Sequence, residues 1–130
     1  MTIIVNVLHG ADKGMNAALK KQCQDFCKKV KLSASSTDAE RGQVNQNAVD
    51  MLADAYPHHN VMLVHPPHHK QFDGDYTQIE LQVDPRFGSF QVYVFKSGKF
   101  TLQGDGGYIN WCFKGNYTRN DKNVTFKQRG

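Results

Sequence analysis

The sequence predicts an α+β fold, in which two N-terminal amphipathic helices pack on one face of a mostly antiparallel sheet of about six to seven strands. Two periodicities lead to this prediction. Apolar residues recur at helical spacing in the first half of the chain, whereas apolar and polar residues alternate in the second half. Turn residues interrupt the alternation, as is typical of an antiparallel meander.

The chain begins with a predicted strand and a predicted helix. Residues 3–8 form a largely β-branched apolar run, which favours a central strand or one that is covered on both faces. A helix is then expected over about 13–31. Its apolar face consists of residues at helical spacing, namely Met15, Leu19, Cys23, Phe26, Cys27 and Val30.

A second helix is predicted after a polar connector. Thr37 and Glu40 have the spacing of a capping box, and Pro57 cannot continue a helical hydrogen-bond ladder. Residues 61–64 then form a short apolar strand. Two strands joined by two helices are expected to run parallel, as in a crossover connection. The buried stripe of the second helix is expected to be Val44, Ala48, Met51, Leu52 and Ala55.

Residues 65–75 are expected to form a loop, because they contain two prolines and a glycine. Residues 76–127 form the predicted meander, and residues 1–65 form the other half of the same domain, 1–130. Alternation assigns an inward direction to one set of meander side chains. These are Ile79, Leu81, Val83, Phe90, Val92, Val94, Phe100, Leu102, Ile109, Trp111, Phe113, Val124 and Phe126.

The composition narrows the possible partners and compartments. A net charge of +4 is too modest for a dedicated nucleic-acid site. No segment approaches the roughly 18 apolar residues that a membrane span needs. The odd number of cysteines and the absence of a signal peptide favour the cytoplasm. Asn116 and Asn123 begin N-x-Thr sequons, so a secreted protein is the alternative if this is a mature chain with an added Met1.

The segment from Gly104 to Trp111 is the strongest candidate for a ligand site. Its glycines permit close approach of the backbone to a ligand, and Asp105 can accept hydrogen bonds from hydroxyl groups. Alternation predicts that Tyr108 and Asn110 point outward, together with Tyr93. An aromatic platform beside an amide and a carboxylate suits a carbohydrate or another polar ligand.

A second candidate is a divalent metal site in the loop at 65–75, with zinc or copper as the metal. Imidazole and carboxylate groups are suitable ligands for these ions, although their spacing matches no established metal motif. The candidate ligands are His65, His68, His69, Asp73 and Asp75. The alternative interpretation is a solvated loop whose histidines titrate near neutral pH.

No arrangement of residues in the sequence resembles a catalytic motif, so the preferred hypothesis is a non-enzymatic binding protein without a cofactor. Its ligand would be a glycan or another polar molecule. One alternative is a hydrolase that uses a metal in the loop at 65–75. Another is a protein that binds a partner through the edge of its meander. Cys112 is a candidate reactive thiol if its side of the strand is open. The sequence does not indicate an oligomeric state.

Overall fold

The computed structural model describes residues 3–30, 32–33, 35–65, 67–84, 88–103 and 111–129. Within these residues the chain is α+β, as predicted, with helices α1 (Lys13–Lys29) and α2 (Asp38–Ala55). The strands of the described residues are β1 (Ile4–His9), β2 (Asn60–Val64), β3 (His68–Phe72), β4 (Tyr76–Gln82), β5 (Phe90–Phe95), β6 (Gly98–Leu102), β7 (Trp111–Lys114), β8 (Asn116–Asn120) and β9 (Asn123–Lys127).

The strands form two sheets, not one meander. The first sheet has five strands in the order β1-β4-β5-β2-β7, and the second has four in the order β3-β6-β9-β8. Every neighbouring pair is antiparallel. The prediction of six to seven strands is therefore wrong, since the described residues contain nine.

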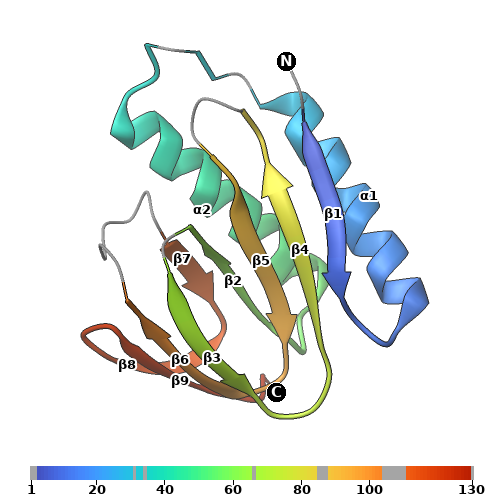
Figure 1. The fold of residues 1–130 in the computed structure, drawn as a ribbon, viewed down its shortest axis with the longest axis vertical. Coiled ribbons are helices and arrows are strands. Elements are labelled where there is room, and N and C mark those ends of the chain that lie inside the picture. The colour runs from blue at the N-terminus through green and yellow to red at the C-terminus, as the bar shows by residue number, and fades with distance from the viewer. Residues whose placement is uncertain are drawn as a thin grey trace.

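The molecule is layered, with the helices on one face of the first sheet and the second sheet across part of the other face (Figure 1). One hydrophobic cluster joins both helices to β1, β4, β5 and β2. A second cluster fills the space between the sheets and contains Met62, Tyr93, Phe95, Phe100 and Trp111. Both faces of β2 and β5 are consequently buried, because each strand contributes side chains to both clusters.

The helix starts follow from local sequence. The Asp12 side chain accepts a hydrogen bond from the backbone N–H of Met15 at 3.0 Å and caps α1. The predicted capping box of α2 is confirmed, since Thr37 and Glu40 each bond the other's backbone N–H. The buried face of α2 differs from the predicted stripe. Its buried residues are Gly42, Asn45, Ala48, Val49, Leu52 and Ala53, whereas Ala55 is exposed.

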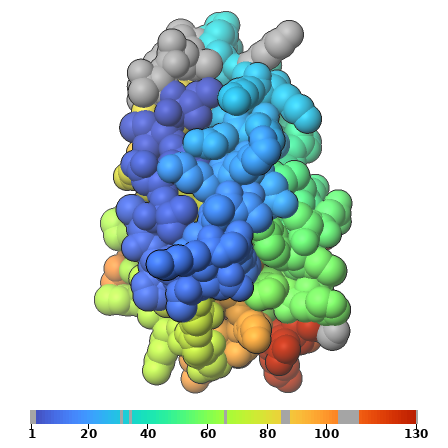
Figure 2. Space-filling model, turned by 90° about the vertical axis from the view of Figure 1, so that its right-hand side faces the viewer, coloured from blue at the N-terminus to red at the C-terminus, as the bar shows by residue number. Residues whose placement is uncertain are grey.

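The two strands that flank the helices are not parallel, and β1 is not central. Two antiparallel strands, β4 and β5, separate β1 from β2, so that β1 and β2 run in opposite directions. The two consecutive helices run along the sheet and back, so β2 begins at the end of the sheet where β1 finishes and runs in the opposite direction. Instead of being covered on both faces, β1 lies at the edge of the sheet, next to α1 (Figure 2).

The predicted loop at 65–75 contains strand β3, which pairs with β6 across the second sheet. A further strand, β8, was missed because the chain changes sheets at Gly115. Its φ of +150° is unfavourable for other residues, and a Cβ there would lie 1.9 Å from the Asn60 side chain. Asn60 is fully buried and hydrogen-bonds to Lys96, Asn116 and Lys127 at this corner.

Candidate functional site

The predicted ligand segment lies largely outside the described residues, which exclude Asp105, Tyr108 and Asn110. Its flanks are described. The backbone N–H of Gln103 donates to the carbonyl of Pro67 at 2.8 Å, and Trp111 pairs with Val64. Trp111 is only 3% exposed, which confirms that its side chain points into the core.

Tyr93 does not lie on an open outer face, so this part of the predicted platform is wrong. It is 1% exposed, and its hydroxyl lies 2.7 Å from Nε2 of His68. Burial raises the pKa of the Tyr93 phenol. The predicted alternation in β5 is confirmed, because Tyr93 points away from Val92 and Val94. The second sheet, however, covers the side to which Tyr93 points.

The structure does not bring the five predicted metal ligands together. His68 and His69 are adjacent in β3, and their side chains therefore point to opposite faces of the second sheet. The inward-pointing ring of His68 stacks on Phe100. His65 bonds the carbonyl of Ser89 through Nδ1 at 2.7 Å.

The two carboxylates among the predicted metal ligands, Asp73 and Asp75, form hydrogen bonds with other parts of the chain. Asp73 accepts a hydrogen bond from the Ser97 hydroxyl at 3.0 Å, and Asp75 accepts one from the backbone N–H of Ala11 at 3.0 Å. Asp75 also lies 3.5 Å from Nε2 of His9. In the part of the chain that the structure describes, no group of three or more His, Cys, Asp or Glu side chains is placed to hold a metal ion.

A different group of polar side chains lies together on the first sheet. Successive side chains of a strand alternate between its faces, so the helix-facing Ile79, Leu81 and Val92 leave their neighbours on the other side. Near β1 and β4 the second sheet does not extend over that side (Figure 1). We call this surface the open face. Its polar members are Asn6, Gln78, Glu80, Gln82 and Gln91, all half-buried or exposed.

Strand register places these side chains next to one another. Glu80 stands opposite both Asn6 of β1 and Gln91 of β5. The amide Nδ2 of Asn6 donates to Oε1 of Glu80 at 3.3 Å, and Nε2 of Gln78 donates to Oε1 of Gln91 at 2.7 Å. Each amide carries donors and an acceptor, and the carboxylate accepts hydrogen bonds only. The open face therefore offers both partners that a hydroxyl group needs.

One end of the open face is bordered by stacked rings and a cation. The ring of His9 stacks on Tyr76 with 4.2 Å between the ring centroids. From β3, the Lys70 ammonium lies 5.8 Å from the ring centroid of Tyr76 and 5.4 Å from that of Tyr93. Leu8, in the adjacent edge strand, is 52% exposed.

Sequence reasoning missed the open face although its signal was present. Gln78, Glu80 and Gln82 alternate with the predicted inward set of β4, and this spacing places all three on one side of the strand.

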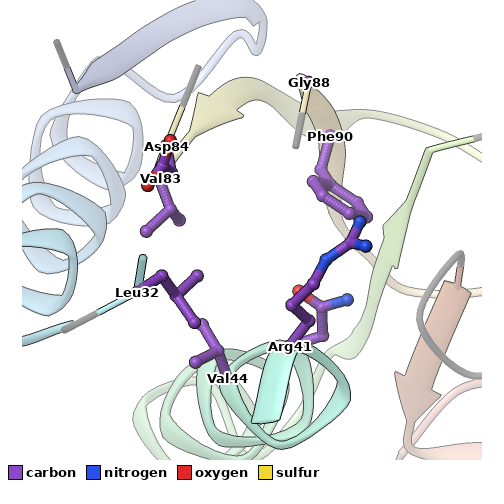
Figure 3. A pocket seen from close by; sticks show the side chains of 8 residues that line it. Leu32, Arg41, Val44, Val83, Asp84, Gly88 and Phe90 are labelled. Atoms are coloured by element: carbon purple, nitrogen blue, oxygen red, sulfur yellow. The ribbon is translucent and has the colours of Figure 1, made fainter. Parts of the chain in front are cut away.

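The cavity at the end of the β4–β5 connection is too small to bind a ligand. Figure 3 shows Arg41 next to Phe90, with Leu32 and Val44 on the adjacent side and Asp84 opposite. Its volume of about 20 Å³ accommodates roughly one water molecule. We therefore assign a packing role to these side chains.

The side of β7 that carries Cys112 faces α2 and is only partly covered, because Cys112 is half-buried. Cys112 faces α2 next to Ala39, Gly42, Gln43 and Gln46, and burial raises the pKa of its thiol to about 12. A raised pKa disfavours the thiolate at neutral pH. All three cysteines are free in the structure. Both sequon asparagines, Asn116 and Asn123, are exposed in the second sheet.

Comparisons with known proteins give a short likeness only. The chain is similar to the stress response protein YvgO of Bacillus subtilis (strain 168), with 45% identity over 38 residues. These residues are 29% of this chain and 24% of the Bacillus protein. No protein family matches the chain, and no solved structure matches it. No helix among the described residues is long and apolar enough to cross a membrane.

Proposed function

We propose that the chain is a non-enzymatic binding protein for a polar, hydroxyl-rich ligand, with a carbohydrate as the preferred class. The observation that supports this proposal is the open face, where amides and one carboxylate from β1, β4 and β5 adjoin one another. Asp105, Tyr108 and Asn110 remain a second part of the proposed site. The short likeness to a stress response protein does not bear on the ligand.

The geometry of an antiparallel sheet suits such a ligand. Side chains on one face lie about 5 Å apart across strands and about 7 Å apart along a strand, so a flat ligand contacts several of them at once. The amides of Gln78 and Gln91 already hydrogen-bond to each other, which holds both in defined positions. Preorganised polar groups reduce the entropy that is lost when a ligand binds.

The charge of the open face indicates a neutral or weakly charged ligand. Glu80 is the carboxylate of the set, and the Lys70 ammonium stands at the border near Tyr76 and Tyr93. A strongly anionic ligand would approach Glu80, and a strongly cationic one would approach Lys70. A ligand that carries many hydroxyls avoids both conflicts.

Glycan-array screening followed by titration calorimetry tests the proposal. We expect the double variant Gln78→Ala/Gln91→Ala to bind the glycan at least about tenfold more weakly, because two amides that can each donate and accept hydrogen bonds are removed. The matched control is Thr101→Ala/Asn123→Ala, which removes another cross-strand polar pair, bonded at 2.9 Å, from the second sheet. Equal affinity in both double variants and the native chain would exclude the open face.

The segment at 104–110 needs a separate variant. Asp105→Ala/Tyr108→Ala is expected to weaken binding of the same glycan if the two parts form one site. Unchanged affinity in this variant, together with a loss in Gln78→Ala/Gln91→Ala, would restrict the site to the open face.

A further inference from the structure

The second sheet ends in an exposed edge at β8. This strand pairs with β9 without a bulge from Asn116 to Asn120, and all five of its side chains are exposed. On its other side, β8 has no described strand as a neighbour. A strand in this position presents unpaired backbone groups that can accept another strand.

The turn after β8 identifies which backbone groups are unpaired. Asn120 pairs with Asn123 across a two-residue turn in which Asp121 has a φ of +55°. Residues that flank a two-residue turn form a hydrogen-bonded pair, and such pairs alternate along an antiparallel ladder. The backbone groups of Thr118 therefore point toward β9. Those of Tyr117 and Arg119 point away from the sheet.

The other described edges are less suited to accept a strand. In β1 the register is irregular between Val7 and His9, and a bulge disrupts edge pairing. In β3 the central residue is Lys70, so two copies paired about it would place two ammonium groups opposite each other. The β7 edge lies beside α2, where Lys114 forms an ion pair with Asp50 at 3.4 Å.

The sequence of β8 is symmetric in chemistry about its central residue. If two copies pair antiparallel about Thr118, Tyr117 of each stands opposite Arg119 of the other, and Asn116 stands opposite Asn120. Arginine and tyrosine attract each other across strands, and threonine pairs and amide pairs are also favourable. The outward backbone groups of Tyr117 and Arg119 would then bond each other.

We propose that β8 is a self-association edge through which two copies of this chain pair about Thr118 and join their four-stranded sheets into one. Tyr117, which is 44% exposed, would be covered in this arrangement. Its partner Arg119 is already held in place, because its guanidinium lies 4.8 Å from the Trp111 ring and its Nε donates to the carbonyl of Asp121.

The interface is small and carries no acidic side chain within β8. A five-residue strand pairing lies at the low end of interface sizes, so the expected dissociation constant is about 10 µM to 1 mM. Each chain has a net charge of +4, and Arg119, Lys122 and Lys127 lie on or near the edge. Screening of this repulsion by salt should strengthen the dimer.

Disulfide trapping tests the register directly. Residue 118 of one copy would lie opposite residue 118 of the other in a non-hydrogen-bonded pair. Their Cβ atoms would be about 5 Å apart, which is close to disulfide distance. Thr118→Cys should therefore form a covalent dimer under mild oxidation. Thr125→Cys is the matched control, because Thr125 pairs with Thr118 on the same face but is one strand further from the edge. Its copies would be about 14 Å apart, beyond disulfide reach.

We expect at least about tenfold more covalent dimer from Thr118→Cys than from Thr125→Cys or the native chain. Sedimentation of the native chain should show a concentration-dependent increase in mass that Thr118→Lys abolishes, because two ammonium groups would face each other. Equal trapping in both cysteine variants would overturn the proposal. A native chain that sediments as a monomer up to about 1 mM would also overturn it.

Discussion

Replacement of Asn60 by alanine should destabilise the fold more than any exposed substitution. Asn60 is 0% exposed, and its Nδ2 donates to the carbonyls of Lys96 at 2.8 Å and Lys127 at 3.0 Å. Its Oδ1 accepts the backbone N–H of Asn116 at 2.8 Å. One side chain thus connects the start of β2 to the β5–β6 turn, the β7–β8 corner and the end of β9.

The magnitude follows from these three hydrogen bonds. Each contributes about 1 kcal/mol net, and a buried group left without a partner costs a further 1 kcal/mol or more, so we expect a loss of about 3–5 kcal/mol. The entropy of unfolding is about 0.27 kcal/mol/K for a chain of 130 residues, which converts a loss of 4 kcal/mol into a decrease of about 15 °C in Tm.

Urea denaturation followed by tryptophan fluorescence measures this loss, because the sequence has a single tryptophan and it is buried between the sheets. Asn116→Ala is the control. It keeps the backbone N–H that Asn60 accepts and removes only a side-chain bond of 3.4 Å to Gln128. A loss below about 1 kcal/mol in Asn60→Ala, or an equal loss in the two variants, would refute the role of Asn60.

Asn60→Asp separates hydrogen bonding from shape. The introduced carboxylate would face the carbonyls of Lys96 and Lys127, so its pKa in the folded state should be raised above the unfolded value. The sign follows from linkage: the variant is most stable below the unfolded pKa and loses stability as the pH rises through the folded pKa. Denaturation midpoints at pH 4 and pH 7 that do not differ would contradict this reasoning.

Other variants and measurements test separate parts of the structure. Gly115→Ala should lower the free energy of unfolding by about 2–4 kcal/mol, because residue 115 has a φ of +150° and a Cβ there would meet Asn60. Gly74→Ala is the comparison in the same denaturation assay: Gly74 has a φ of +73° but open space around it, so the loss should be smaller. Thr37→Ala removes the cap of α2 and should cost about 1 kcal/mol by thermal melting; an unchanged Tm would show that the cap contributes nothing. Native-state alkylation followed by mass spectrometry should leave Cys112 unmodified at pH 8, and rapid labelling without denaturant would contradict this. The free energy of unfolding should fall as the pH rises above about 9, because the pKa of each of the three thiols is raised in the folded state. Elemental analysis of unchelated protein should find no stoichiometric zinc or copper; a stoichiometric metal would favour the hydrolase alternative.

Local features were predictable because neighbouring residues determine them. The Thr37–Glu40 capping box fixes the start of α2, and the spacing of Leu19 and Cys23 identifies the buried side of α1. In β5, alternation correctly separated Val92 and Val94 from Tyr93. Each of these inferences uses residues within one or two turns of helix or one strand.

Features that depend on distant segments were not predictable in the same way. The direction of β2 relative to β1 depends on two strands that come later in the chain. The position of β3 depends on its pairing with β6, which prolines and histidines in its own sequence do not indicate. Gly115 turns the chain into the second sheet at a point where the alternating pattern continues almost undisturbed.

By itself, the sequence determined the fold class, the capping box of α2 and the residues that share a side of the predicted strands. Only the tertiary structure decided which of those sides are covered. Tyr93 and Gln91 point the same way from β5, but the second sheet buries Tyr93 and leaves Gln91 half-buried beside Glu80. The physical reason is that side-chain alternation is a local property of the backbone, whereas burial depends on which remote segment packs against that side.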